Sequence, residues 1–244
     1  MRRLSIVLTP VLLVVGCAAV PPDPHRIVVF AAASLRAAFT ELDAAFRSAD
    51  PGAAVEFSFA GSADLLAQLT GGARADVFAS ADAATMDRAV DAGLVDEPTA
   101  FATNTLTIVV PPGNPKVINT FGDLRGVSVV ACAPQVPCGA ALTRIEAATG
   151  VDLTPVSEEN SVTDVLNKVI SGQADAGLAY VTDARAAAGR VTSVAIPESG
   201  AAVNTYRIAV TRDAANPAIG RRFIELLTGP TGREILRRAG FGPA

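Results

Sequence analysis

Four predicted helices of this chain begin with small residues whose protons could hold an anion. Ser34 and Ser62 each follow a predicted strand and precede a helix, while Cys138 and Val162 stand at the starts of two further helices. The first turn of a helix leaves backbone N–H groups unpaired and carries a partial positive charge, so it binds anions without lysine or arginine. A serine at a helix start is also a common N-cap, and spacing alone leaves both interpretations open.

The elements that must position these residues alternate between strand and helix. Residues 26–30 form a β-rich run, and the apolar residues of 35–46 recur at helical spacing. The same alternation predicts further strands at 55–59, 76–80, 106–110, 127–131, 176–180, 191–196 and 206–210, and helices after Ser62 and at 83–92, 139–148, 162–170, 217–227 and 231–239. This order indicates an α/β protein with mainly parallel sheets.

Two lobes are expected from the length of the chain. Its 244 residues exceed the roughly 100–200 that are usual for one domain. Boundaries near residues 103 and 205 would assign 26–103 and 206–244 to the first lobe and 104–205 to the second.

The N-terminal residues 1–16 have the pattern of a secretory signal peptide. A basic start is followed by a short apolar run that Pro10 interrupts, which is too short for the ~20 apolar residues of a membrane span. The ending Val-Val-Gly-Cys resembles a bacterial lipobox, which implies cleavage before Cys17 and lipidation of its sulfur. The alternative is an ordinary signal peptide with an incidental cysteine. The proline-rich residues 17–25 are expected to be a tether.

The remaining cysteines and the charge narrow the classes of function. Outside the cytoplasm Cys132 and Cys138 would tend to form a disulfide, although two free thiols remain an alternative. A zinc site is disfavoured because the one histidine, His25, lies in the tether. The net charge of −4, with no basic stripe, argues against nucleic acid as a partner. An acidic protein must hold an anion by local donors.

Several motifs, in order, resemble the periplasmic molybdate-binding proteins of ABC importers. They are Val-Val-Phe-Ala-Ala-Ala-Ser-Leu at 28–35, Phe-Ala-Gly-Ser at 59–62, Ala-Asp-Val-Phe-Ala-Ser-Ala-Asp at 75–82, Val-Pro-Cys-Gly at 136–139, Glu-Asn-Ser-Val at 159–162, Gly-Leu-Ala-Tyr at 177–180, Gly-Pro at 229–230 and Gly-Phe-Gly at 240–242. The resemblance implies a two-lobed periplasmic-binding-protein fold of type II, with the ligand in the cleft between the lobes.

The resemblance also implies a ligand shell. Ser34 and Ser62 would donate from hydroxyl and backbone N–H groups, Cys138 and Val162 from backbone N–H groups, and Tyr180 from its phenol. Gly61 and Ala63 stand where relatives can have serines, so fewer hydroxyls would line that turn.

The partners follow from the same resemblance. The ligand would be molybdate or tungstate, with molybdenum bound only as the oxyanion and without direct metal ligands. An ABC permease and its ATPase would receive the ligand. The protein would be a monomer on the outer face of the cytoplasmic membrane, and its lipid anchor would be the one contact with that membrane. No cofactor is expected.

The chemistry of the ligand is consistent with such a shell. Molybdate carries no proton near neutral pH, so it accepts hydrogen bonds only, whereas phosphate carries a proton that needs an acceptor. Leaving that proton unpaired would cost ~1–3 kcal/mol. Sulfate is also free of protons, so only its smaller size can exclude it.

The sequence fits other functions less well. A receptor of the same fold for sulfate or another small anionic solute is the main alternative, and an iron receptor is disfavoured because only Tyr180 and Tyr206 are available. An enzyme is not expected, since the chain has no Gly-x-Ser-x-Gly motif and no histidine outside the tether. Asp76 and Asp82 are interpreted as caps or hydrogen-bond acceptors, and Arg36 as a solvated or ion-paired side chain.

Overall fold

The computed structural model describes residues 24–244. The predicted signal peptide, the lipidation site Cys17 and most of the predicted tether lie outside the described residues. Within residues 24–244, none of the helices combines the length and the apolar character that crossing a bilayer requires.

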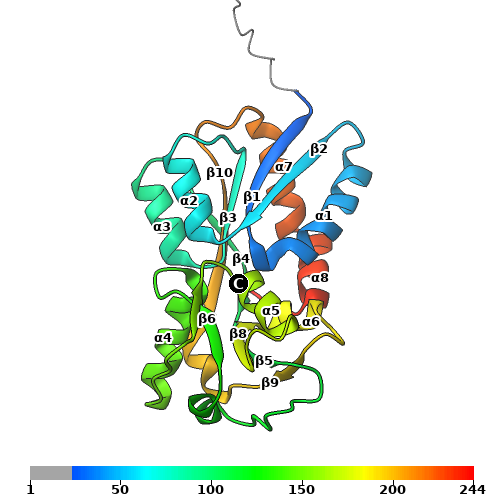
Figure 1. Ribbon diagram of the computed structural model, residues 1–244. Helices are drawn as coiled ribbons and strands as arrows, with labels where there is room; N and C mark the ends of the chain where they lie inside the picture. Colours follow the sequence, from blue (N-terminus) through cyan, green and yellow to red (C-terminus); the bar gives the residue numbers. More distant parts are fainter. Residues whose placement is uncertain (1–23) are drawn as a thin grey trace, which may run out of the picture.

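The chain folds into two lobes, each built on a five-stranded sheet with helices on its faces (Figure 1). The first sheet has the strand order β2-β1-β3-β10-β4. Its strands are β1 (Arg26–Ala32), β2 (Ala54–Ala60), β3 (Val77–Ser80), β4 (Thr99–Asn104) and β10 (Asn204–Val210). Its helices are α1 (Arg36–Ala49), α2 (Ser62–Thr70), α3 (Ala83–Asp91), α7 (Pro217–Thr228) and α8 (Pro230–Ala239).

The second sheet has the order β7-β6-β8-β5-β9. Its strands are β5 (Leu106–Val110), β6 (Val129–Cys132), β7 (Ser157–Glu159), β8 (Ala176–Tyr180) and β9 (Thr192–Val194), and its helices are α4 (Pro137–Thr149), α5 (Val162–Ile170) and α6 (Val181–Ala186). Short 3-10 segments complete the chain: η1 (Ala33–Leu35), η2 (Phe121–Gly126) and η3 (Pro197–Ala202). The short elements β7 and α6 and the strand β4 carry too little periodicity to be distinguished by pattern, and they were not predicted, whereas β9 lies within the strand expected at 191–196.

The sheets are mixed, which corrects the expectation of mainly parallel sheets. In the first sheet β1 pairs in parallel with β2 and β3, whereas β10 is antiparallel to β3 and β4. The second sheet repeats this division, with β5 antiparallel to β8 and β9. The reason is that β10 and β5, the first strands after each passage between the lobes, start at the crossing and therefore run opposite to the other strands of their sheets. Strand-and-helix alternation cannot reveal this direction.

Aromatic and aliphatic side chains fill both faces of the first sheet. On one face Phe39 and Phe46 of α1 meet Phe223 of α7 edge-on, with ring centroids 5.7 and 5.5 Å apart. On the other face Leu65 of α2 and Met86 of α3 belong to a separate buried cluster. Packing on both faces explains why the central strands are continuously apolar. The buried strands in turn hold the turns that follow them in fixed positions.

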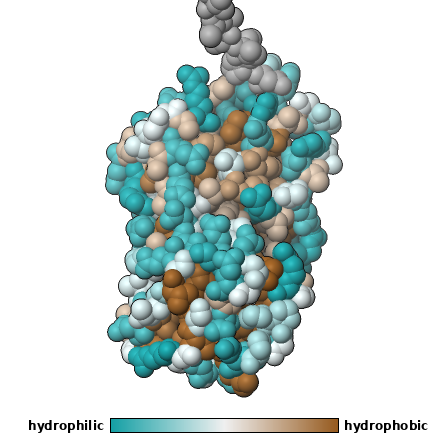
Figure 2. All heavy atoms as spheres, in the orientation of Figure 1, coloured by the Kyte–Doolittle hydropathy of each residue, from teal (hydrophilic) through white to brown (hydrophobic). Residues whose placement is uncertain are grey.

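The chain passes between the lobes twice, and both passages lie side by side. β4 ends at Asn104 just before β5 begins, and β10 begins at Asn204 on the return. These two residues are register partners in the antiparallel pairing of β4 with β10. Hydrophilic residues cover much of the face shown in Figure 2, including the junction of the lobes, and hydrophobic residues gather mainly over the lower lobe.

Candidate functional site

A cavity lies between the lobes, and all five residues predicted as the ligand shell line it. Ser34 and Ser62 come from the first lobe, and Cys138, Val162 and Tyr180 come from the second. The cavity and its open mouth together enclose about 230 Å³ of space, part of which is open to solvent. None of the residues that line it carries a charged side chain.

Helix starts converge on this cavity from four directions. Ser34 lies in η1, which leads into α1, and Ser62 is the first residue of α2. Cys138 is the second residue of α4, after Pro137, and Val162 is the first residue of α5. At such positions the backbone N–H has no carbonyl partner within its own helix. The positive end of each helix dipole also lies at the helix start, beside the cavity. The cavity is therefore favourable for a negative charge.

The two serines are not the N-caps that their positions alone would suggest. The Ser62 hydroxyl oxygen accepts a hydrogen bond from the Ala81 backbone N–H at 3.0 Å, and the Ser34 hydroxyl oxygen lies 2.9 Å from the Tyr206 phenol oxygen. Both serines are buried. Because a neighbouring N–H already donates to the Ser62 oxygen, its own proton is free to donate into the cavity.

Tyr180 ends β8 and places its phenol among the site residues. Only 1% of this residue is exposed, and its phenol oxygen accepts a hydrogen bond from Asn204 Nδ2 at 2.6 Å. Burial, followed by nearby Tyr206, Asp82 and Asp183, raises the pKa of Tyr180 well above its usual value. The phenol is therefore a neutral donor over the whole physiological pH range.

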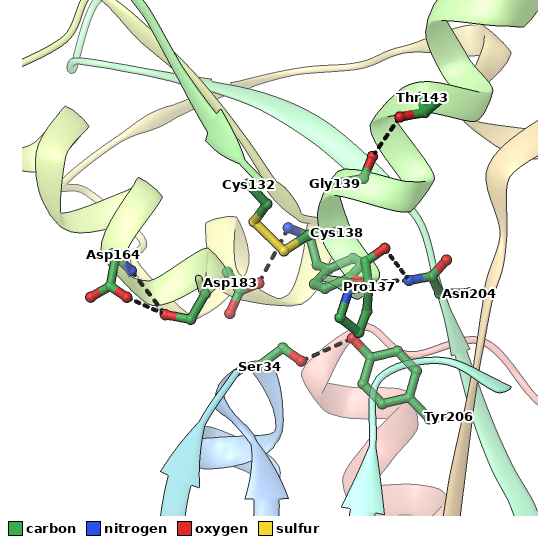
Figure 3. The surroundings of a disulfide bond; sticks show 12 residues. Ser34, Cys132, Pro137, Cys138, Gly139, Thr143, Asp164, Asp183, Asn204 and Tyr206 are labelled. Carbon is green, nitrogen blue, oxygen red and sulfur yellow. Dashed lines mark hydrogen bonds between the residues drawn. A yellow bond between two sulfur atoms is a disulfide. The ribbon is translucent and has the colours of Figure 1, made fainter. Parts of the chain in front are cut away.

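A disulfide joins the end of β6 to the first turn of α4. The Cys132 and Cys138 Cα atoms are 5.6 Å apart, and their sulfurs are bonded (Figure 3). Of the two alternatives left open by the sequence, the structure contains the bridge. Because Cys138 also lines the cavity, the bridge ties this part of the lining directly to the sheet.

The other candidate residues have structural partners. Asp76 accepts hydrogen bonds from the backbone N–H groups of Val28 and Asn216, both at 2.8 Å, and Asp82 caps α3 through Thr85 N–H at 3.0 Å. Arg36 is exposed, as expected for a solvated side chain, and its guanidinium also lies over the Phe59 ring, 4.5 Å from the ring centroid. Among residues 24–244, no group of three or more histidine, cysteine, aspartate or glutamate side chains could hold a metal ion.

Sequence patterns missed a second layer of polar residues behind the shell. Asn104 and Asn204 are 5% and 2% exposed, and Tyr206 is fully buried. Figure 3 shows the Ser34 hydroxyl directed at the Tyr206 phenol, with Pro137 and Asn204 beside them. No local pattern marks these residues, because their contacts join segments that are far apart in the chain.

Comparisons with known proteins agree with this fold. A family model described as bacterial extracellular solute-binding protein matches residues 27–242. The periplasmic molybdate-binding protein of Azotobacter vinelandii superposes with a TM-score of 0.77 at 24% identity, covering 89% of this chain and 99% of that one. The sulfate-binding protein SubI of Mycobacterium tuberculosis superposes with a TM-score of 0.75 at 23% identity, covering 90% and 87%. The chain belongs to the bacterial extracellular solute-binding proteins and has their two-lobed α/β fold.

Sequence relatives narrow the family further. The molybdate-binding protein ModA of Mycobacterium tuberculosis H37Rv is 56% identical over 220 residues, which cover 89% of this chain and 84% of the relative. ModA of Escherichia coli K12 is 32% identical over 232 residues, which cover 90% of each. The chain is a member of the ModA family.

Proposed function

We propose that this protein captures molybdate in the cavity between its lobes and delivers it to an ABC importer. The observation that carries the proposal is the composition of the cavity, which both lobes line with hydroxyl and backbone N–H donors and without a charged side chain. Tungstate has nearly the same size and charge as molybdate, and it would bind as well.

The physical argument concerns what a proton-free dianion needs once it leaves water. Its oxygens only accept hydrogen bonds, so the protons of Ser62 and Tyr180 and the N–H groups of the helix starts can replace its hydration. Hydrogen bonds to a charged group contribute ~1.5–3 kcal/mol each. A phosphate that carries a proton would find no carboxylate among the lining residues to accept that proton.

The relatives favour molybdate over sulfate as the ligand. ModA proteins at 56% and 32% identity are both named molybdate-binding, while the likeness to the sulfate-binding SubI, at 23% identity, concerns the fold alone. Sulfate is the second candidate because it too carries no proton. Its smaller size would leave its hydrogen bonds long in a cage that packing and a disulfide hold rigid.

Delivery requires the protein to lie outside the cytoplasmic membrane. The family description is extracellular, and residues 1–16 with Cys17 would export the chain and attach it by lipid to the outer face of that membrane. A monomer without cofactor or enzymatic activity would then present the closed, loaded form to the permease and its ATPase.

Titration calorimetry with molybdate, tungstate and sulfate on the wild type and two serine variants tests the proposal. Tight 1:1 binding of the first two anions and much weaker binding of sulfate are expected. Ser34→Ala and Ser62→Ala should each weaken molybdate binding by about 10- to 150-fold, the equivalent of ~1.5–3 kcal/mol.

Ser48→Ala is the matched control. Its hydroxyl bonds the Ala44 carbonyl on the exposed side of α1 at 2.9 Å, far from the cavity, so its molybdate affinity should equal that of the wild type. Wild-type affinity in both cavity variants would exclude this ligand shell, and saturation by sulfate without any molybdate heat would exclude molybdate as the ligand.

A further inference from the structure

Two asparagines stand at the point where the chain crosses between the lobes, directly behind the cavity. Asn104 is the last residue of β4 and Asn204 the first of β10, and they are register partners. Both are buried, and both place their amide nitrogens on tyrosine hydroxyls, those of Tyr206 and Tyr180 respectively.

The orientation of the Asn204 amide is determined by its neighbours. Its oxygen accepts a hydrogen bond from Arg144 Nη2 at 2.5 Å, and a guanidinium can only donate. Its Nδ2 therefore faces the Pro137 carbonyl at 3.1 Å and the Tyr180 phenol oxygen at 2.6 Å. The amide nitrogen has no lone pair to accept from the phenol, so the Tyr180 proton must point elsewhere.

The Asn104 amide is oriented in the same way. Its oxygen accepts from the backbone N–H of Thr105 at 3.0 Å, and its Nδ2 donates to Thr182 Oγ1 at 2.8 Å and, more weakly, to the Tyr206 phenol oxygen at 3.4 Å. The Tyr206 phenol in turn lies 2.9 Å from Ser34 Oγ. Either hydroxyl can donate across this contact, and the Ser34 proton is left for the cavity when Tyr206 is the donor.

We propose that Asn104 and Asn204 are positioning residues that direct the hydroxyl protons of Tyr180 and, through Tyr206, of Ser34 toward the bound oxyanion. Asn204 donates to the Tyr180 phenol oxygen, so the Tyr180 proton is directed to the cavity. Asn104 donates to the Tyr206 phenol oxygen, and Tyr206 then orients the Ser34 hydroxyl. Buried hydrogen-bond chains of this kind polarise one another, which strengthens the last donor.

The arrangement also has a consequence for lobe closure. Asn104 joins Tyr206 of the first lobe to Thr182 of the second, and Asn204 leaves the first sheet to reach Pro137 and Tyr180 of the second lobe. The donors are therefore aligned by contacts that span both lobes. This inference rests on the proposed function, because it assumes that Tyr180 contacts the anion.

A double-mutant cycle on Asn204 and Tyr180, with molybdate affinity measured by calorimetry, tests the inference. Tyr180→Phe removes the hydroxyl that Asn204 orients. Asn204→Ala should weaken molybdate binding about tenfold when Tyr180 is present and should have almost no effect when residue 180 is Phe. Asn119→Ala, at an exposed asparagine in an irregular segment, should leave the affinity unchanged in both backgrounds. Melting temperatures without ligand would separate loss of folding from loss of binding.

The results separate the positioning role of Asn204 from the proposed binding of molybdate by Tyr180. If Asn204→Ala weakens binding by the same factor in both backgrounds, its role is structural and the inference is wrong, while the ligand shell stands. If Tyr180→Phe binds molybdate as tightly as the wild type, Tyr180 is not a ligand and both the shell and the inference fail.

Discussion

Single residues in this site acquire their chemistry from the groups that contact them. The Ser62 hydroxyl proton is left available because the Ala81 N–H donates to the Ser62 oxygen, and Tyr180 stays protonated because it is buried. Neither property belongs to the residue type alone. A serine with its oxygen free would have been an ordinary cap, and an exposed tyrosine would have lost its proton at a lower pH.

Asp183 is the titratable residue most affected by the same burial. Its carboxylate accepts the Tyr180 backbone N–H at 3.2 Å at the start of α6, and burial raises its pKa from 3.8 to about 7 despite that hydrogen bond. Tyr180 and Tyr206 are the titratable groups coupled to it electrostatically.

Asp183 should make the stability of the protein fall as pH rises from about 4 to about 7. In this window the folded protein keeps a proton on Asp183 that the unfolded chain has released, so the free energy of unfolding decreases with pH by at most ~1.4 kcal/mol per unit. Asp183→Asn keeps an acceptor for Tyr180 N–H and should remove this slope in urea unfolding at stepped pH. Asp91→Asn, on the surface at the end of α3, should leave the slope in place; a slope that persists in Asp183→Asn would contradict the assignment.

At the scale of elements, the start of α4 illustrates how a donor is held in place. Pro137 occupies the first position, where its missing N–H costs nothing. Gly139 follows, and a Cβ there would lie 1.9 Å from the Ala133 carbonyl oxygen, so only glycine permits this approach of helix to loop. The disulfide then ties the same turn to β6.

Removal of the bridge should reduce stability more than binding. The variant Cys132→Ala/Cys138→Ala opens a loop of sequence separation 6, and the free energy of unfolding should fall by about 2 kcal/mol. Molybdate affinity should fall by a smaller factor, because alanine at 138 keeps the backbone N–H. Denaturant unfolding of the wild type with and without reductant measures the free energy of unfolding that the bridge contributes. The double variant is the control, because reductant should not change its free energy of unfolding. Equal stability of oxidised and reduced wild type would refute the expectation.

At the scale of the whole molecule, the two lobes meet directly at the mouth of the site. Gly61, before α2 in the first lobe, lies so close to the second lobe that a Cβ on it would come within 2.2 Å of the Asn160 carbonyl oxygen. Its φ of −58° is accessible to any residue, so glycine is needed for the approach and not for the backbone conformation. Ligand that contacts both lobes stabilises this closed arrangement.

Gly61→Ala should therefore hinder closure while leaving each lobe folded. We expect about tenfold or weaker molybdate binding with an unchanged melting temperature of the free protein, because the binding-competent closed form becomes a smaller fraction. Calorimetry and small-angle scattering with and without molybdate would measure the two effects. Gly126→Ala, at an exposed glycine with open space around its Cβ position, is the control, and wild-type affinity in Gly61→Ala would show that this contact does not limit closure.

Local sequence patterns were enough to predict the alternation of strands and helices and the small residues at four helix starts. Both are local properties: apolar periodicity and turn chemistry are complete within about ten residues, so they can be predicted without the fold. The family motifs added the order of the site residues, and the structure brought Ser34, Ser62, Cys138, Val162 and Tyr180 around one cavity.

The polar residues behind the cavity lining could be identified only from the folded protein. Ser34 and Tyr206 are 172 residues apart in the chain. Asn104 and Tyr206 are 102 apart, and the pairing of β4 with β10 brings these two together. The antiparallel strands at the lobe crossings and the contact of Gly61 with Asn160 have the same origin. Such contacts form only when packing brings two distant segments together. Because the hydrophobic driving force for that packing comes from the whole core, no short stretch of sequence can predict the contacts.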